Sequence, residues 1–132
     1  MNQAELNADA VRRGYQAFNA DDLDTLTELF DKNVSWHTPG RGPFAGDRLG
    51  REAVFQLFGS YKSETGGTFK VTLKRVLTDA EGQVISVHHA TAERKGKHLE
   101  VDGCIAFEFQ DGKIVRGKEF IFDLYPLDEF WE

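Results

Sequence analysis

Apolar residues in the first part of the chain recur at intervals of three and four positions, which is the period of an amphipathic α-helix. We predict a helix over residues 3–19 from one such stripe, formed by Leu6, Ala10, Val11, Gly14, Tyr15 and Phe18. Asp21 or Asp22 can cap a second helix, because a carboxylate accepts hydrogen bonds from the free N–H groups of a first turn. The apolar face of this second helix consists of Leu23, Leu26, Leu29 and Phe30.

A short extended segment, residues 34–38, stops at Pro39 and is followed by a glycine- and proline-rich stretch. Residues 39–50 contain four glycines and two prolines, so we expect a loop there. A third helix follows and ends by Gly66 and Gly67. Its apolar face consists of Val54, Leu57, Phe58 and Tyr61.

From residue 68 onward the period changes to two, which predicts β-strands. We expect strands over residues 68–78, 83–94 and 97–109, and a final strand that runs from the Asp111-Gly112 turn to about Tyr125 before Pro126 ends it. Helices followed by an antiparallel meander predict the α+β class, with one curved sheet and the helices packed on one face.

The last predicted strand is apolar on both faces, with Phe120, Phe122 and Leu124 on one side and Val115 and Ile121 on the other. Such a strand needs cover on both faces, and the three helices can cover only one. We therefore expect a homodimer through the outer face of the sheet, an isologous pairing being the commonest symmetric choice. The alternative is a few exposed apolar side chains, which are normal on any surface.

Composition agrees with one small domain over residues 1–132, with a net charge of −6 and a mass of 14.9 kDa. The negative charge argues against nucleic-acid partners and anionic membranes. The single cysteine, Cys104, excludes an internal disulfide and is compatible with the reducing cytoplasm, where we expect the protein to reside. Two Trp, three Tyr and eleven Phe suggest a core or pocket built from aromatic rings.

Several segments together resemble the nuclear-transport-factor-2-like superfamily, and within it the SnoaL-like and ketosteroid-isomerase-like proteins. They are Trp36-His37-Thr38-Pro39-Gly40, Gly50-Arg51-Glu52-Ala53-Val54, Asp111-Gly112-Lys113-Ile114 and the tail from Asp123 to Trp131. The resemblance implies a cone-shaped half-barrel, with a curved, mostly antiparallel sheet and three N-terminal helices on its concave face. It also implies a pocket that serves isomerases, cyclases, dehydratases, epoxide hydrolases or non-enzymatic binders.

The chain departs from the steroid isomerases of that superfamily at two positions. Thr38 stands where the resemblance would place the aspartate base, and Ile105 stands near the position of their oxyanion-hole aspartate. The resemblance therefore implies the pocket without their catalytic groups, and we do not expect steroid isomerisation by that machinery.

The register of the strands predicts which polar side chains enter the pocket. A two-residue Lys95-Gly96 turn pairs His88 with Gly103. A three-residue loop at Gln110–Gly112 then pairs Gly103 with Glu119, so that an imidazole and a carboxylate could approach each other over a glycine. Asp123 would lie on the same face as Glu119. A two-residue Asp111-Gly112 turn would instead pair Gly103 with Phe120 and send Glu119 to the opposite face.

A histidine and a carboxylate in an aromatic pocket can transfer protons, since burial brings both pKa values toward neutrality. The leading hypothesis is a cofactor-free enzyme of the isomerase, cyclase, dehydratase or hydrolase class, acting on a small hydrophobic carbonyl or hydroxyl compound. His88 would be the general acid or base, and Glu119 and Asp123 would orient it or share its proton. The alternatives are a structural pair in a non-catalytic ligand-binding protein, or a dimeric interaction domain.

We expect the remaining pocket wall to bind the ligand, although apolar stripes are often plain core. The wall residues are Tyr15, Trp36, Thr38, Phe58, Ile105 and Ile121. His37 should point away from the side that Trp36 faces, and His89 and His98 should lie at the surface or an interface. We expect no metal site, because adjacent His88 and His89 point apart, and no dinucleotide site, because the glycine spacing after Pro39 does not fit.

Overall fold

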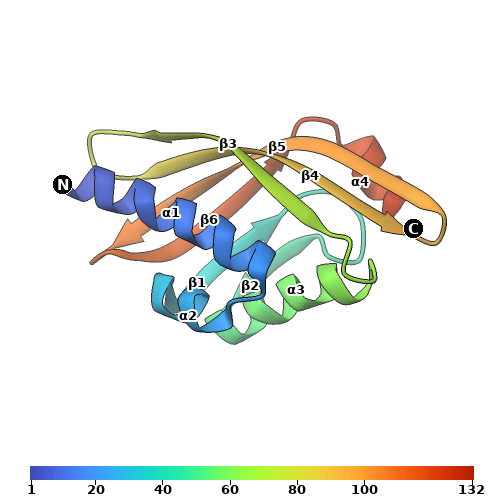
Figure 1. Cartoon of the computed structure of the whole chain (residues 1–132), viewed down its shortest axis with the longest axis horizontal. Coiled ribbons are helices and arrows are strands. Elements are labelled where there is room, and N and C mark those ends of the chain that lie inside the picture. Colours follow the sequence, from blue (N-terminus) through green and yellow to red (C-terminus); the bar gives the residue numbers. More distant parts are fainter.

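The computed structural model describes all 132 residues as four helices around one six-stranded sheet (Figure 1). The helices are α1 (Gln3–Ala20), α2 (Leu23–Leu29), α3 (Arg51–Ser63) and α4 (Leu124–Phe130). The strands are β1 (Phe30–Thr38), β2 (Gly46–Leu49), β3 (Lys70–Thr78), β4 (Val84–Arg94), β5 (Lys97–Gln110) and β6 (Lys113–Ile121). This arrangement confirms the predicted α+β class and the three N-terminal helices.

The two aspartates between the first helices have separate roles. Asp21 adopts a left-handed conformation, with φ 58°, and ends α1. Asp22 is the N-cap of α2, where its carboxylate accepts a hydrogen bond from the backbone N–H of Thr25. Phe30, which we placed on the apolar face of the second helix, instead begins β1.

The strands are ordered β2-β1-β6-β5-β4-β3, with β1 and β6 parallel and all other neighbours antiparallel. The predicted meander β3–β6 is present. The extended segment predicted at residues 34–38 belongs to β1, which begins earlier, at Phe30, and β1 and β2 extend the sheet beyond β6. The prediction that residues 39–50 form only a loop is wrong, because Gly46–Leu49 pairs with β1 as an edge strand. This four-residue strand lacks an apolar alternation, so its sequence carries no strand signal.

The last strand ends earlier than predicted. It stops at Ile121, and Asp123 then caps α4 by accepting a hydrogen bond from the N–H of Tyr125. Pro126 lies in the first turn of α4, where no backbone N–H is needed for a helical hydrogen bond. The proline is therefore part of a helix rather than the end of a strand.

The register between β5 and β6 differs from both alternatives drawn from the sequence. The turn has two residues, Asp111 and Gly112, both with positive φ, and it pairs Gln110 with Lys113. The register then shifts between Phe109 and Glu108, where Val115 is one extra residue on β6. Because of this β-bulge, Gly103 pairs with Ile121 rather than with Glu119 or Phe120.

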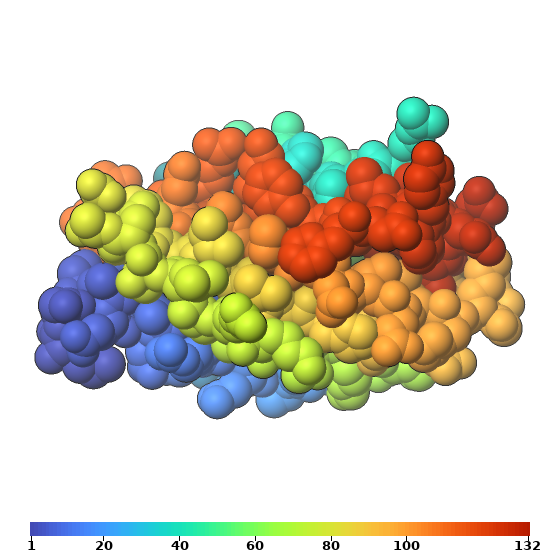
Figure 2. Space-filling model, turned by 90° about the horizontal axis from the view of Figure 1, so that it is seen from above, coloured from blue at the N-terminus to red at the C-terminus, as the bar shows by residue number.

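The helices and the concave face of the sheet enclose one hydrophobic core, while the opposite face of the sheet carries exposed apolar side chains. Figure 2 shows this side of the molecule, formed by strands β3 to β6, with α1 (blue) and α4 (red) at its margins. Leu77 pairs with Ile85 there, and both are about half exposed, as is Phe120 on β6. No helix of the chain is both long and apolar enough to cross a membrane.

Gly103 on β5 lies against β6 with no room for a side chain, and its substitution tests the observed register. A Cβ atom there would lie 2.5 Å from the carbonyl oxygen of Phe120 and 2.8 Å from Cδ1 of Ile121. We expect Gly103→Ala to lower the free energy of unfolding by about 1–3 kcal/mol in urea denaturation, because the backbone of β6 has to move. Gly59→Ala is the control: no atom lies within 4 Å of its Cβ position in α3, so it should be neutral or stabilising. A neutral Gly103→Ala would contradict the register.

Candidate functional site

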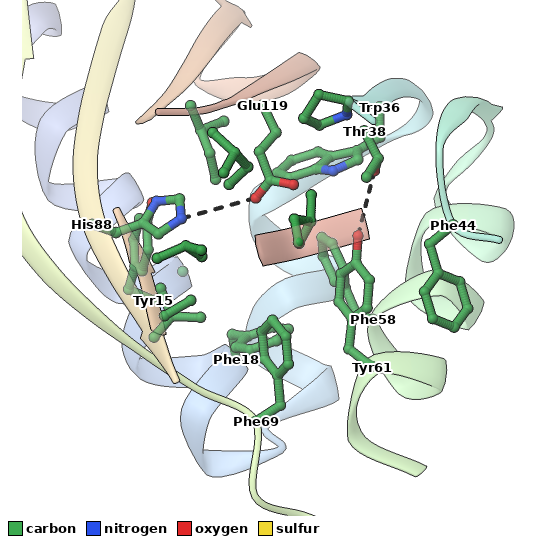
Figure 3. Close-up of a pocket in the computed structure, with 18 of the residues that line it drawn as sticks. Tyr15, Phe18, Trp36, Thr38, Phe44, Phe58, Tyr61, Phe69, His88 and Glu119 are labelled. Carbon is green, nitrogen blue, oxygen red and sulfur yellow. Dashed lines mark hydrogen bonds and ion pairs between the residues drawn. The ribbon is translucent and has the colours of Figure 1, made fainter. Parts of the chain in front are cut away.

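A cavity of about 100 Å³ lies between the concave face of the sheet and helices α1 and α3 (Figure 3). Hydrophobic residues make up 21 of the 28 that line it, so the cavity suits an apolar molecule. Eight residues that we expected from the sequence line the cavity: Tyr15, Trp36, Thr38, Phe58, His88, Ile105, Glu119 and Ile121. The lining contains no lysine or arginine.

The central polar pair is His88 on β4 and Glu119 on β6, with 3.9 Å between His88 Nε2 and Glu119 Oε2. The β-bulge places Glu119 opposite Ile105, on the same face of the sheet as His88. Glu119 therefore faces the cavity as predicted, although by a different register. The two side chains meet diagonally across β5, and the space over Gly103 is covered by Ile121 rather than left open.

The imidazole is held on its other side by hydrogen bonds. His88 Nδ1 lies 3.0 Å from the Tyr15 hydroxyl, which lies 2.7 Å from the hydroxyl of Ser86. All three residues are buried, and the His88 side chain is only 2% exposed. The row Ser86–Tyr15–His88 therefore fixes the ring and directs Nε2 toward Glu119.

Burial shifts the two pKa values in opposite directions. Desolvation raises the pKa of Glu119 from 4.5 to about 7, and desolvation lowers the pKa of His88 from 6.5 to about 4. Near pH 7 the imidazole is thus neutral, while the carboxyl group is present in both its protonated and its ionised form. Of the two groups, Glu119 is therefore the one whose charge changes near neutral pH.

A second polar group of the cavity lies on the side of Glu119 away from His88. The Tyr61 hydroxyl of α3 is 3.4 Å from the hydroxyl of Thr38, and burial raises the pKa of Tyr61 above its usual range. The indole Nε1 of Trp36 is buried and has no hydrogen-bond partner in the chain. Figure 3 shows this nitrogen between Glu119 and Thr38, directed at the cavity.

Aromatic residues that we did not assign to the pocket close the rest of the cavity. They are Phe18, Phe30, Phe44, Tyr61, Phe69, Phe107 and Trp131. Tyr61 lies on the predicted apolar face of α3, so its helical spacing could have identified it. Trp131 follows α4 and packs edge-on against Phe44, with 4.7 Å between ring centroids. The C-terminal tail therefore forms one wall of the cavity, a role that no periodicity in the sequence indicates.

Some titratable residues lie away from the cavity. Asp123 is exposed and caps α4, so the expected position of its carboxylate beside Glu119 is not observed. At the surface, His37 Nδ1 lies 2.6 Å from Asp47 Oδ1. His89 and His98 lie on the opposite face of the sheet from His88, and both contact Glu100. No group of three or more His, Cys, Asp or Glu side chains is arranged to hold a metal ion.

The two buried groups predict opposite pH dependences of the free energy of unfolding. Because the pKa of Glu119 is raised, the folded chain holds a proton that the unfolded chain has released, and stability falls as the pH rises from 4.5 to about 7. Because the pKa of His88 is lowered, the unfolded chain takes up a proton first, and stability falls as the pH drops from 6.5 to about 4. The two effects oppose each other between pH 4.5 and 6.5.

Glu119→Gln should remove the first effect alone. We expect this variant to gain stability relative to the wild type by roughly 2 to 3 kcal/mol more at pH 8 than at pH 5, measured by urea unfolding. Exposed Glu81→Gln is the control, and its difference from the wild type should be the same at both pH values. An equal effect of Glu119→Gln at both pH values would show that the carboxyl group titrates normally.

Comparisons with known proteins agree with this architecture. A sequence model of the SnoaL-like domain matches residues 11–117. The chain is 59% identical to Bal32a, from a soil-derived mobile gene cassette, over 99% of this chain and 100% of that one, with a TM-score of 0.98. An uncharacterised protein of Mycobacterium tuberculosis is 35% identical over 127 residues, which is 96% of this chain and 97% of that protein. A Xanthomonas campestris protein of unknown function with a cystatin-like fold is 26% identical, covering 99% of this chain and 98% of that one, with a TM-score of 0.89.

These matches confirm the resemblance found in the sequence, and structures described as NTF2-like share the fold. None of the three similar proteins has a stated activity, so the comparisons define the fold and leave the chemistry to the cavity. The chain belongs to the SnoaL-like domain family.

Proposed function

We propose that the cavity binds a small, largely apolar carbonyl or hydroxyl compound and that Glu119 transfers a proton to or from it. The observation that carries this proposal is a carboxyl group with a pKa of about 7 that faces an apolar cavity without a cationic partner. A group that titrates near the working pH is most effective as a general acid or base. Buried carboxyl groups with such shifts are enriched at catalytic sites.

The geometry favours Glu119 over His88 as the group that moves the proton. The Glu119 side chain retains 17% exposure, whereas that of His88 has 2% and is held through Nδ1 by Tyr15. With its pKa lowered to about 4, His88 has little tendency to accept a proton at neutral pH. His88 therefore acts as a positioning residue, whose Nε2 faces the carboxyl group.

For a ketone in the cavity, the proposed step conserves atoms and charge. Ionised Glu119 accepts a proton from the carbon next to the carbonyl group, and the electrons of the broken C–H bond form a C=C bond. The carbonyl oxygen takes up the negative charge as an enolate. Protonated Glu119 then exchanges its proton with solvent and delivers one to the same carbon, which gives hydrogen exchange. Where the enolate is conjugated with a further C=C bond, Glu119 can instead deliver the proton to the far carbon of the dienolate, which gives isomerisation.

Hydrogen exchange measures this step without knowledge of the natural substrate. With 1-indanone as the probe in D₂O, we expect the wild type to accelerate deuterium incorporation at the carbon next to the carbonyl group, followed by NMR. The rate should rise with pH up to about 7 and then level off, because the base is ionised Glu119. Glu119→Gln should reduce the protein-dependent rate at least a hundredfold, since one general base typically contributes a factor of 10² to 10⁴.

Asp123→Asn is the matched control, because Asp123 is an exposed carboxylate outside the cavity. It should keep the rate of the wild type. Exchange that persists in Glu119→Gln would remove this residue from the mechanism.

A non-catalytic binding protein is the second candidate. It is favoured by the hydrogen-bonded row Ser86–Tyr15–His88, which satisfies buried polar groups as a purely structural network would. In that case 1-indanone would bind and raise the melting temperature, and neither the wild type nor Glu119→Gln would accelerate exchange.

We also propose that the outer face of the sheet pairs with a second copy of the chain. Leu77, Ile85 and Phe120 are exposed there, and no helix covers them. Phe120→Lys should shift the mass seen in sedimentation equilibrium from twice 14.9 kDa toward one chain, because a buried unpaired ammonium group is costly. Leu49→Lys, at an exposed apolar residue of the β2 edge, is the control and should remain dimeric. A wild type that sediments as one chain would refute the pairing.

A further inference from the structure

The indole N–H of Trp36 is a hydrogen-bond donor that the folded chain leaves unused. Trp36 is only 4% exposed, and its Nε1 contacts no acceptor. Leaving a buried donor without a partner costs about 1–3 kcal/mol, and such groups are rare in folded proteins. Packing alone would be served equally well by an aromatic ring without a polar atom.

The chain holds this indole ring in a fixed place. Gly117 pairs with Trp36 in the parallel register of β1 and β6, and a Cβ atom at Gly117 would overlap Cζ3 and Cε3 of the indole. Phe58 and Phe107 pack edge-on against the ring, with centroid distances of 5.1 and 5.9 Å. The N–H direction is therefore set before any ligand binds.

The Trp36 N–H and the Glu119 carboxyl group face the same part of the cavity. Glu119 lies two residues after Gly117 on β6, so both point to the cavity side of the sheet. In Figure 3 the carboxyl group of Glu119 lies between the His88 ring and the Trp36 indole. An oxygen bound to Trp36 would consequently sit beside the group that exchanges a proton.

We propose that Trp36 Nε1–H donates a hydrogen bond to the acceptor oxygen of the bound molecule, and that the site therefore selects neutral carbonyl compounds. This inference rests on the proposed function and specifies its substrate class. A carboxylate ligand is disfavoured, because the lining holds Glu119 and Asp128 and no lysine or arginine. A hydrocarbon of the same shape leaves the donor unpaired, so it loses this contribution to binding. When the carbonyl oxygen gains charge as an enolate, the same hydrogen bond strengthens.

Replacement of one atom tests the proposal. β-(3-Benzothienyl)alanine at position 36 puts sulfur in place of the indole N–H and preserves the ring shape. The probes are 1-indanone and indane, and titration calorimetry measures their affinities. We expect the wild type to bind 1-indanone more tightly than indane. The sulfur variant should bind 1-indanone about three- to tenfold more weakly, the range of one neutral hydrogen bond, and indane unchanged.

An infrared measurement separates a hydrogen bond from a packing effect. The carbonyl stretch of bound 1-indanone should lie at lower frequency in the wild type than in the sulfur variant. Phe69→Leu is the matched control, because Phe69 lines the same cavity, carries no donor and packs on Phe18, Tyr61 and Trp131 rather than on the indole of Trp36. It should weaken both probes without moving the carbonyl frequency.

A third readout needs no ligand: the sulfur variant should melt no lower than the wild type, because the N–H makes no hydrogen bond within the chain.

The inference is overturned if the ketone and the hydrocarbon bind the wild type equally, or if the carbonyl frequency is the same in both proteins. Absence of binding by either probe would overturn the proposed function as well. Loss of exchange in Glu119→Gln with an unshifted carbonyl band would overturn only the role of Trp36.

Discussion

The β-bulge at Val115 is the local irregularity on which the whole site depends. Successive side chains of a strand alternate between the two faces of a sheet, so a regular β6 after the Asp111-Gly112 turn would direct Glu119 outward. One extra residue reverses this alternation for the rest of the strand. As a result Glu119 enters the cavity, Gly117 leaves room for the Trp36 indole, and Phe120 faces outward.

The row of hydrogen bonds behind His88 explains how a buried carboxyl group can change its charge without disturbing its neighbours. If Tyr15 donates to Nδ1, the proton of the neutral imidazole is on Nε2, facing ionised Glu119. If the Tyr15 hydroxyl instead donates its hydrogen bond to Ser86, His88 Nδ1–H donates to the Tyr15 oxygen. His88 Nε2 then carries no proton and faces protonated Glu119. Both arrangements keep the imidazole neutral, in agreement with its lowered pKa.

The sequence was sufficient for the three N-terminal helices, the meander and part of the aromatic cavity wall, because these depend on local periodicity and composition. It placed His88 opposite Gly103 correctly, since two positive-φ residues in the Lys95-Gly96 turn determine that register. It could not place Val115, because nothing in its neighbourhood distinguishes a bulge from a regular strand. The sequence also assigned Asp123 to the last strand, because Pro126 was expected to end that strand. The fold shows instead that Pro126 lies in the first turn of α4 and that Asp123 caps this helix. The proposal that Glu119 rather than His88 transfers the proton rests on the burial of both groups, which periodicity does not encode.

Two costly features in one small cavity argue that it is a binding site rather than an imperfect core. Apart from Arg94 Nε, buried side-chain polar atoms elsewhere make hydrogen bonds within the chain, as when Asn7 donates to the carbonyl oxygen of Gly82. The cavity instead retains a carboxyl group without a cation and an indole N–H without an acceptor. Leucine or phenylalanine at either position would fill the space without these costs. A neutral carbonyl compound would meet both requirements at once. Its oxygen would accept a hydrogen bond from Trp36 Nε1–H, and its acidic carbon would lie against Glu119.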